Sequence, residues 1–342
     1  MTKSEQPIKK YLNPNQTIGV ESETHPDLPF ANEEQAEDLL EQGMQALQQG
    51  ELEIALYALQ ESVQHYRGVG NPEQEAKALY YIGLVEYGRG NYELTLSWAE
   101  SCCDLLTPRP RCRLLGQALS LMGNAYRHCH HPDEAIAFQT QSLKVFQELE
   151  DLSGQMAAYN NLGLAYKAQG QMQKAIECQQ EALEIAQKLE DRNIIAQILR
   201  NLGNACYSLG NYRGAIRYYE ERFQLAQEMK DERTAVQILR NLANASYTIG
   251  DYQRAIAYSE QRLHIARHLG DHRSQEQALG SLGVAYDAQG DYQKAIRCYE
   301  HRLKVARILK DHRVERQALG SLRTACYALG DYARIMEYQS EV

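Results

Sequence analysis

The sequence has few of the residues and segments that mark membrane-embedded, secreted or loop-rich proteins. Only 8 prolines, 4 phenylalanines and 1 tryptophan occur among its 342 residues. No segment approaches the roughly 18 consecutive apolar residues that a membrane-spanning helix needs. Residues 1–7 lead into no apolar stretch that could serve as a secretory signal. We therefore expect neither a membrane span nor a secretion signal.

Cysteine is present but unpatterned. The eight cysteines follow no regular disulfide spacing. Disulfide frameworks of secreted domains show recurrent spacings, whereas thiols of the cytosol are kept reduced. We therefore expect a reducing, cytoplasmic compartment.

Positive charge is scarce in the first half of the chain and in slight excess in the second. The formal net charge of -9 divides into -13 for residues 1–190 and +4 for residues 191–342. A balance this mild does not favour a nucleic-acid partner, which would need a basic stripe. The positive half could attract an acidic protein partner.

No pattern of catalytic residues stands out. The sequence contains no nucleophile elbow, phosphate-binding glycine loop or paired-acid arrangement, so we expect neither an enzyme nor a bound cofactor. An enzyme would need a catalytic cluster that departs from the rest of the chain, and the departures are residues 1–31 and 102–131.

Two histidine-containing segments suggest metal binding, and neither completes a site. The tetrad His-Cys-His-His at 128–131 could join Cys112. Cys112 and Cys129, however, lie at opposite ends of one expected helix, about 25 Å apart at 1.5 Å per residue, whereas zinc needs converging ligands. His264 and His268 are four residues apart on another expected helix and lack a third ligand nearby. No metal site is predicted.

What the sequence does have is a period of 40 residues. Seven of eight lattice positions hold glycine, and His130 stands at the remaining one. The lattice glycines are Gly50, Gly90, Gly170, Gly210, Gly250, Gly290 and Gly330. Apolar residues between them recur every three or four positions, as in Ile195, Leu199, Leu202, Cys206 and Leu209. Self-similarity at a fixed period of this size predicts a solenoid of helical hairpins.

Glycine also occupies the interior of the expected first helix of most units. The position seven residues before the lattice glycine holds Gly83, Gly123, Gly163, Gly203 and Gly283, with Ala243 once. Glycine in a helix interior is about 1 kcal/mol less favourable than alanine. Its recurrence predicts that the neighbouring helix approaches closely there.

The motifs of one unit resemble the tetratricopeptide repeat. Leu162-Gly163, Tyr166, Gly170 and Ala175-Ile176 carry the likeness, and the 40-residue form is similar to the repeats of the Pins/LGN cell-polarity adaptors. The resemblance implies an all-α, right-handed superhelical solenoid of about eight hairpins over residues 32–342, with the last unit truncated. Residues 1–31, which hold four of the prolines, are expected to be a disordered N-terminal arm.

The same resemblance implies that the first helices line a concave groove that holds an extended peptide or a helix. A polar stripe recurs on those helices at steps of three and four residues, which places it on one face. Asparagine can pair with any peptide backbone, arginine with a carboxylate, and tyrosine offers flat contact area. The alternative is that the stripe is merely a solvated face. The predicted peptide-binding residues are Asn160, Asn161, Lys167, Gln197, Arg200, Asn201, Asn204, Tyr207, Gln237, Arg240, Asn241, Asn244 and Tyr247.

These patterns predict a protein-interaction scaffold or adaptor that binds an extended, probably acidic, peptide. The alternative is a regulatory sensor or assembly factor whose superhelix changes shape when a partner binds. Arg222, Arg262 and Arg302 share one lattice position, and they could project into the groove or pair with glutamates of adjacent units. The apolar C-terminal end, which includes Tyr332 and Met336, is expected to self-associate or to be covered by a partner.

Overall fold

The computed structural model describes residues 32–340, and these residues form sixteen helices and no strand. The expected arm at residues 1–31 and the last two residues lie outside this range. In chain order the helices are α1 (Glu33–Gln49), α2 (Leu52–Val69), α3 (Pro72–Arg89), α4 (Tyr92–Leu106), α5 (Arg113–His128), α6 (Pro132–Glu148), α7 (Leu152–Ala168), α8 (Met172–Lys188), α9 (Arg192–Ser208), α10 (Tyr212–Glu228), α11 (Glu232–Thr248), α12 (Tyr252–His268), α13 (His272–Ala288), α14 (Tyr292–Ile308), α15 (His312–Leu329) and α16 (Tyr332–Ser340).

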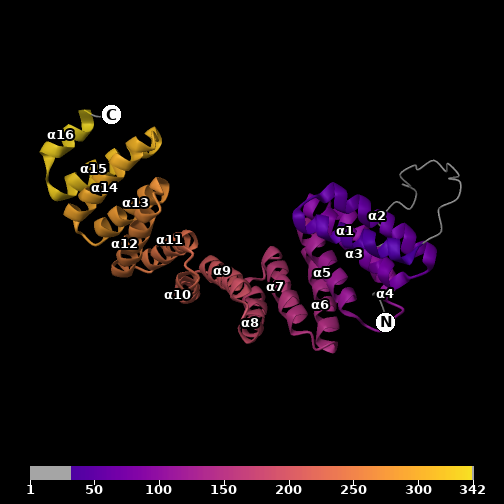
Figure 1. Cartoon of the computed structure of the whole chain (residues 1–342). Helices are drawn as coiled ribbons and strands as arrows, with labels where there is room; N and C mark the ends of the chain where they lie inside the picture. The colour runs from indigo at the N-terminus through magenta and orange to yellow at the C-terminus, as the bar shows by residue number, and fades with distance from the viewer. Residues whose placement is uncertain (1–31, 341–342) are drawn as a thin grey trace.

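Each helix packs mainly against the helices before and after it in the chain. An odd-numbered first helix and the even-numbered second helix that follows it form one unit, so α1 and α2 are unit 1, and α15 and α16 are unit 8. The units follow one another along an elongated, curved array from α1 to α16 (Figure 1). The prediction of an all-α repeat solenoid is confirmed.

The turn inside each unit explains the lattice glycines. Their φ angles lie between 76° and 84° in all seven cases, a left-handed conformation that glycine adopts without steric cost. His130 takes the same role with φ 62°. This is a structural reason for a histidine at that position, and it needs no metal.

Capping residues begin most helices. Between units, the aspartates at 151, 191, 231, 271 and 311 each accept a hydrogen bond from the backbone N–H three residues later, at 3.0–3.1 Å. Within units, Asn211, Asp251 and Asp291 do the same, whereas the Asn91 side chain makes no cap hydrogen bond. These bonds satisfy backbone donors that a helix start leaves unpaired.

The glycines inside the first helices lie where a large side chain of the second helix crosses them. A Cβ atom at Gly203 would lie 2.4 Å from Tyr219 Cε1, and one at Gly283 would lie 2.3 Å from Tyr299 Cε1. Unit 6 has Ala243 at this position, and the lattice equivalent of the two tyrosines is Ser259. Glycine therefore occurs opposite tyrosine and alanine opposite serine, so the predicted close approach is confirmed together with the cause of its one exception.

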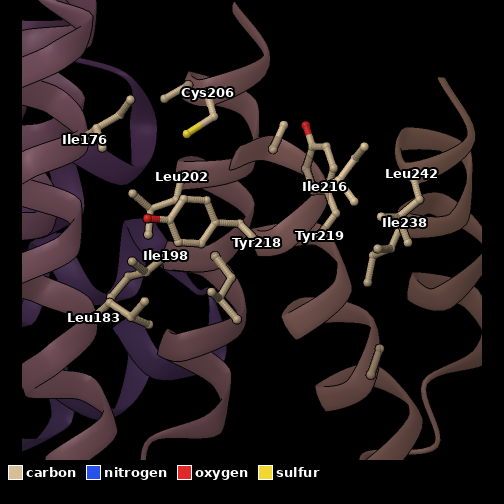
Figure 2. Packing of buried hydrophobic residues seen from close by; sticks show 14 of the residues in the cluster. Ile176, Leu183, Ile198, Leu202, Cys206, Ile216, Tyr218, Tyr219, Ile238 and Leu242 are labelled. Carbon is tan, nitrogen blue, oxygen red and sulfur yellow. The ribbon is translucent and has the colours of Figure 1, made fainter. Parts of the chain in front are cut away.

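Leucine and isoleucine side chains fill the space between units. Ile198, Leu202, Ile238 and Leu242 on α9 and α11 are completely buried. They belong to one cluster with residues of α8 and α10, such as Ile216 (Figure 2). Burial of one such side chain contributes about 1.5–3 kcal/mol relative to leaving it exposed, and neighbouring units share this contribution.

The second helices are also joined by tyrosines. Tyr258 donates to Glu220 at 2.5 Å, Tyr338 donates to Glu300 at 2.9 Å, and Tyr218 accepts from Gln180 at 2.9 Å. All three pairs are 38 residues apart, so the same contact links α8–α10, α10–α12 and α14–α16. A repeated hydrogen bond of this kind fixes how one unit stacks on the next.

The pairing of small and large residues in each hairpin predicts how Ser259 can be changed. Ser259→Tyr alone should lower the free energy of unfolding by about 1–3 kcal/mol, because the ring would overlap the Ala243 methyl group. The double variant Ala243→Gly/Ser259→Tyr should recover most of this loss, since it recreates the pair of units 5 and 7. Urea denaturation followed by circular dichroism measures both. Additive effects of the two substitutions would contradict the pairing.

Candidate functional site

The predicted peptide-binding residues lie on the first helices α7, α9 and α11, and they differ in exposure. The exposed ones are Lys167, Gln197, Arg200, Tyr207, Gln237, Arg240, Asn244 and Tyr247. The half-buried ones are Asn160, Asn161, Asn201, Asn204 and Asn241. The stripe therefore offers mainly arginine, glutamine and tyrosine to solvent.

Several asparagines of the stripe already bond within the chain. Asn161 Nδ2 donates to Ser120 Oγ at 3.1 Å, and Asn201 Nδ2 donates to Asn160 Oδ1 at 3.4 Å. The Asn204 Oδ1 accepts the Tyr219 hydroxyl at 2.8 Å. The first two bonds link neighbouring first helices, so these amides help to hold the units together. Sequence reasoning missed this use because it requires contacts about 40 residues apart.

Asn244 differs from its lattice equivalent Asn204. Ser259 replaces the tyrosine that would have bonded to it, and Asn244 is exposed with no amide hydrogen bond to any other residue that the structure describes. Its amide can therefore offer both a donor and an acceptor to a ligand.

A groove opens in units 6 to 8, where the tyrosine ring is missing. It encloses about 550 Å³ and is lined by side chains of α11, α12, α13, α14 and α15. We call it the arginine groove. Its lining includes the predicted residues Arg240, Asn244 and Tyr247, and it does not include those of α7 and α9. The residues that line it are Arg240, Ala243, Asn244, Tyr247, Ala255, Ser259, Arg262, Arg273, Glu276, Gln277, Gly280, Ser281, Val284, Arg302, Arg313, Val314 and Gln317.

Arg262 is the most unusual residue of the arginine groove. Only 2% of its surface is exposed. Its Nη2 donates to Gln277 Oε1 at 2.7 Å, and its Nε has no hydrogen-bond partner. Burial, followed by the nearby charge of Arg240, lowers the pKa of Arg262 to about 10. A buried guanidinium normally has a carboxylate partner, and Arg262 forms no ion pair with any described residue.

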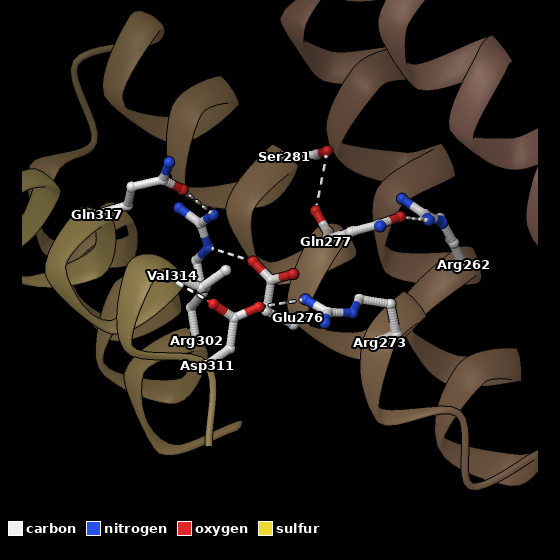
Figure 3. Close-up of polar contacts among 9 residues, drawn as sticks. All are labelled: Arg262, Arg273, Glu276, Gln277, Ser281, Arg302, Asp311, Val314 and Gln317. Carbon is white, nitrogen blue, oxygen red and sulfur yellow. Dashed lines mark hydrogen bonds and ion pairs between the residues drawn. The ribbon is translucent and has the colours of Figure 1, made fainter. Parts of the chain in front are cut away.

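Arg302, which is the lattice equivalent of Arg262 one unit later, does have such a partner. Its Nε donates to Glu276 Oε1 at 2.7 Å, and its Nη2 donates to Gln317 Oε1 at 3.4 Å (Figure 3). The two side chains of the ion pair are 17% and 4% exposed. Arg302 thus pairs with a glutamate of its own unit, whereas the sequence suggested adjacent units.

A second ion pair lies at the rim of the groove. Arg273 Nη1 donates to Asp311 Oδ2 at 2.7 Å (Figure 3). This hydrogen bond is the main cause that lowers the pKa of the Asp311 carboxyl. It joins the start of α13 to the start of α15.

Positive charge therefore predominates in the arginine groove. Five arginines and one glutamate contribute to the lining. The ion pairs with Glu276 and Asp311 neutralise Arg302 and Arg273, and they leave Arg240, Arg262 and Arg313 without a carboxylate partner among residues 32–340. Such a site can bind a negatively charged group through charge-assisted hydrogen bonds.

A smaller hollow near the other end of the array has a different character. It encloses about 240 Å³ between α3, α5 and α7, and its lining includes Tyr80, Leu84, Leu121 and Phe146. Arg113 is the one charged residue in its lining. The side of the first helices thus changes from partly apolar to cationic along the array.

The histidine and cysteine segments do not converge. Cys112 immediately precedes α5 and Cys129 immediately follows it, so they lie at opposite ends of that helix. No cluster of three or more potential metal ligands occurs among the described residues. None of the helices of residues 32–340 is both long and apolar enough to cross a bilayer.

Comparison with known families agrees with the repeat pattern. Two family models, both described as tetratricopeptide repeat, match the chain. One matches residues 154–228 and 234–308, and the other matches residues 200–266. No curated protein sequence matches the chain significantly.

Several solved structures share the arrangement of helices. A signal transduction ATPase with numerous domains and a tetratricopeptide repeat sensor, from Pyrococcus horikoshii, has a TM-score of 0.62 and 17% identity over 90% of this chain. This chain spans 46% of the length of that protein. The apo form of RapI has a TM-score of 0.57 and 15% identity over 80% of this chain and 98% of RapI. BtubC (BKLC) from P. vanneervenii has a TM-score of 0.53 and 19% identity over 72% of this chain and 94% of BtubC. At these identities the likeness concerns the fold alone.

The buried ion pair of unit 7 leads to a stability prediction. Glu276→Ala should lower the free energy of unfolding by about 3 kcal/mol, because it leaves the Arg302 guanidinium largely buried without a carboxylate. Glu315→Ala removes a more exposed ion pair with Arg307 and should change stability by at most about 1 kcal/mol. Urea denaturation of the two variants checks this, and equal losses would show that burial of the Glu276–Arg302 pair has no energetic consequence.

Proposed function

Because this is a chain of tetratricopeptide repeats, we propose that it is a non-catalytic scaffold that holds an extended, acidic segment of a partner protein along its first helices. Repeat arrays of this kind offer long continuous surfaces for protein partners. The observation that carries the acidic part of the proposal is the arginine groove, with its three arginines that lack a carboxylate partner.

The groups in and beside the groove suit an extended peptide. Asn244 offers a free amide for a peptide N–H or C=O, and Tyr247 lies one turn further along the same helix. One unit earlier, the exposed Arg200, Gln197 and Tyr207 continue the same face of the first helix. An extended segment that crosses from α9 to α13 would therefore meet backbone-binding amides and carboxylate-binding arginines in turn.

A sensor that changes shape is the second candidate, and one feature of the packing favours it. First helices of consecutive units pack against each other in the pairs α1–α3, α3–α5, α5–α7 and α11–α13. Between α7 and α11 they meet mainly through the second helices. This thinner packing would let the array bend when a partner binds. A change in radius of gyration by small-angle scattering on adding the partner, greater than the partner's own mass explains, would support this candidate.

The groove proposal is tested with charge-reversed variants on two faces. The first is Arg240→Glu/Arg313→Glu in the arginine groove, where both side chains are exposed. The matched control is Arg267→Glu/Arg297→Glu on the second helices α12 and α14, where both are also exposed. Partners captured from lysate by the wild type are identified, and their binding segments are measured by calorimetry.

The groove variant should weaken binding at least tenfold, because each charge-assisted hydrogen bond contributes about 1.5–3 kcal/mol. The control variant should bind like the wild type. Affinity for the wild type should fall as salt rises from 50 to 300 mM, values chosen to span the Debye lengths over which exposed charges are screened. Loss of binding in the control variant alone would place the interaction on the second helices and refute the groove.

A further inference from the structure

Three successive units carry different residues at one trio of structurally equivalent positions. In chain order the trio comprises two first-helix positions, four residues apart, and one second-helix position, where arginine occurs each time. Unit 5 has Ala196, Arg200 and Arg222; unit 6 has Val236, Arg240 and Arg262; unit 7 has Glu276, Gly280 and Arg302. The helices that carry them have equal lengths and begin at equivalent residues, so the trios can be compared directly.

Unit 7 satisfies its arginine internally. Glu276, the first member of the trio, accepts the Arg302 Nε at 2.7 Å. The second member is Gly280, and a Cβ atom there would lie 3.2 Å from the Arg302 Nε. The carboxylate is thus supplied by the chain, and there is no second arginine.

Unit 6 has the opposite composition. Val236 stands where Glu276 stands in unit 7, and Arg240 stands where Gly280 stands. Two guanidinium groups are therefore close enough for Arg240 to lower the pKa of Arg262, and no carboxylate lies between them. Arg262 is 2% exposed, and its Nε is without a partner. Ser259 replaces a tyrosine ring there, and both residues line the open groove.

Unit 5 repeats the arrangement in a less open form. Arg222 also has an Nε without a hydrogen-bond partner, and the charge of Arg200 contributes to lowering its pKa. Its equivalent of Ser259 is Tyr219, whose ring occupies the space beside Gly203. Unit 6 is therefore the better developed of the two sites.

We propose that Arg240 and Arg262 form a carboxylate-binding pocket that takes an acidic side chain of the bound segment into the place that Glu276 occupies beside Arg302. The chain itself shows the chemistry, because unit 7 fills the equivalent place with a glutamate carboxylate. Arginine presents two parallel N–H donors, which match the two oxygens of such a group. This inference rests on the proposed function and specifies which residue type of the partner is recognised, and where.

The test supplies the carboxylate from within the chain. Val236→Glu should place a carboxylate beside Arg262, as Glu276 does beside Arg302, and Val236→Gln has the same size without the charge. Gln253→Glu adds the same charge at an exposed position of α12 and controls for long-range electrostatics. The probe is a hexaglutamate peptide with acetylated and amidated ends, measured by calorimetry at 50 mM salt.

Val236→Glu should weaken hexaglutamate binding at least tenfold relative to Val236→Gln, and Gln253→Glu should weaken it less than twofold. Without any peptide, Val236→Glu should also have a higher midpoint of thermal unfolding than Val236→Gln, because it neutralises a buried charge. Arg262→Gln, a second variant that needs no extra volume, should weaken binding to the same degree as Val236→Glu.

Equal affinities of Val236→Glu and Val236→Gln, or no binding of hexaglutamate to the wild type, would overturn the pocket. Displacement of the peptide by inorganic phosphate at a lower concentration than by glutarate would overturn the carboxylate in favour of a phosphoryl group. The partner-capture comparison of Arg240→Glu/Arg313→Glu with its control is independent of these results. A groove that still binds partners while the pocket fails would leave the proposed function standing without this inference.

Discussion

The close contact between the two helices of each unit is the constraint on which the rest of the structure depends. A large residue of the second helix lies against the backbone of the first, and the first helix has room for it only where it lacks a side chain, as at Gly203 and Gly283. The distance between the helices fixes the direction in which each hairpin points, and hence how the next one stacks. When the pair changes to Ala243 and Ser259, the helices remain in place and a hollow opens instead.

That hollow connects packing to chemistry. Arg262 occupies a lattice position that is serine or alanine in units 1, 3 and 4. Small residues there need no partner beyond a backbone carbonyl, as Ser62 and Ser142 show by donating to Ala36 and Gly116. An arginine at the same position requires a negative charge. The array meets this requirement internally in unit 7 and leaves it open in unit 6, so neighbouring units with the same backbone differ in what they can bind.

The fold could be predicted from the sequence because a solenoid repeats every local signal. The lattice glycines, the helical apolar spacing and the interior glycines each occur often enough to confirm one another, and even the exception at His130 follows the same turn geometry. The candidate site could be predicted only in part. Arg240, Asn244 and Tyr247 were found from their spacing on one helix, because that spacing is local. The state of Arg262 depends on Val236, Ser259 and Gln277, which lie up to 26 residues away and on three helices. No periodicity identifies such a set, and its signal was the joint change of the trio positions between units.

The nearest-neighbour packing also determines how the molecule would respond to force. Units that touch only in sequence order are connected in series, so a pull on the two ends loads every junction equally, and each extends according to its own compliance. The junctions between α7 and α11, where first helices meet mainly through second helices, would yield first. The α11–α13 junction, with its direct packing of first helices, and the α13–α15 junction, with the Arg273–Asp311 ion pair across it, would keep their geometry longer. Tension would thus lengthen the middle of the array while the cationic end stays in its binding form.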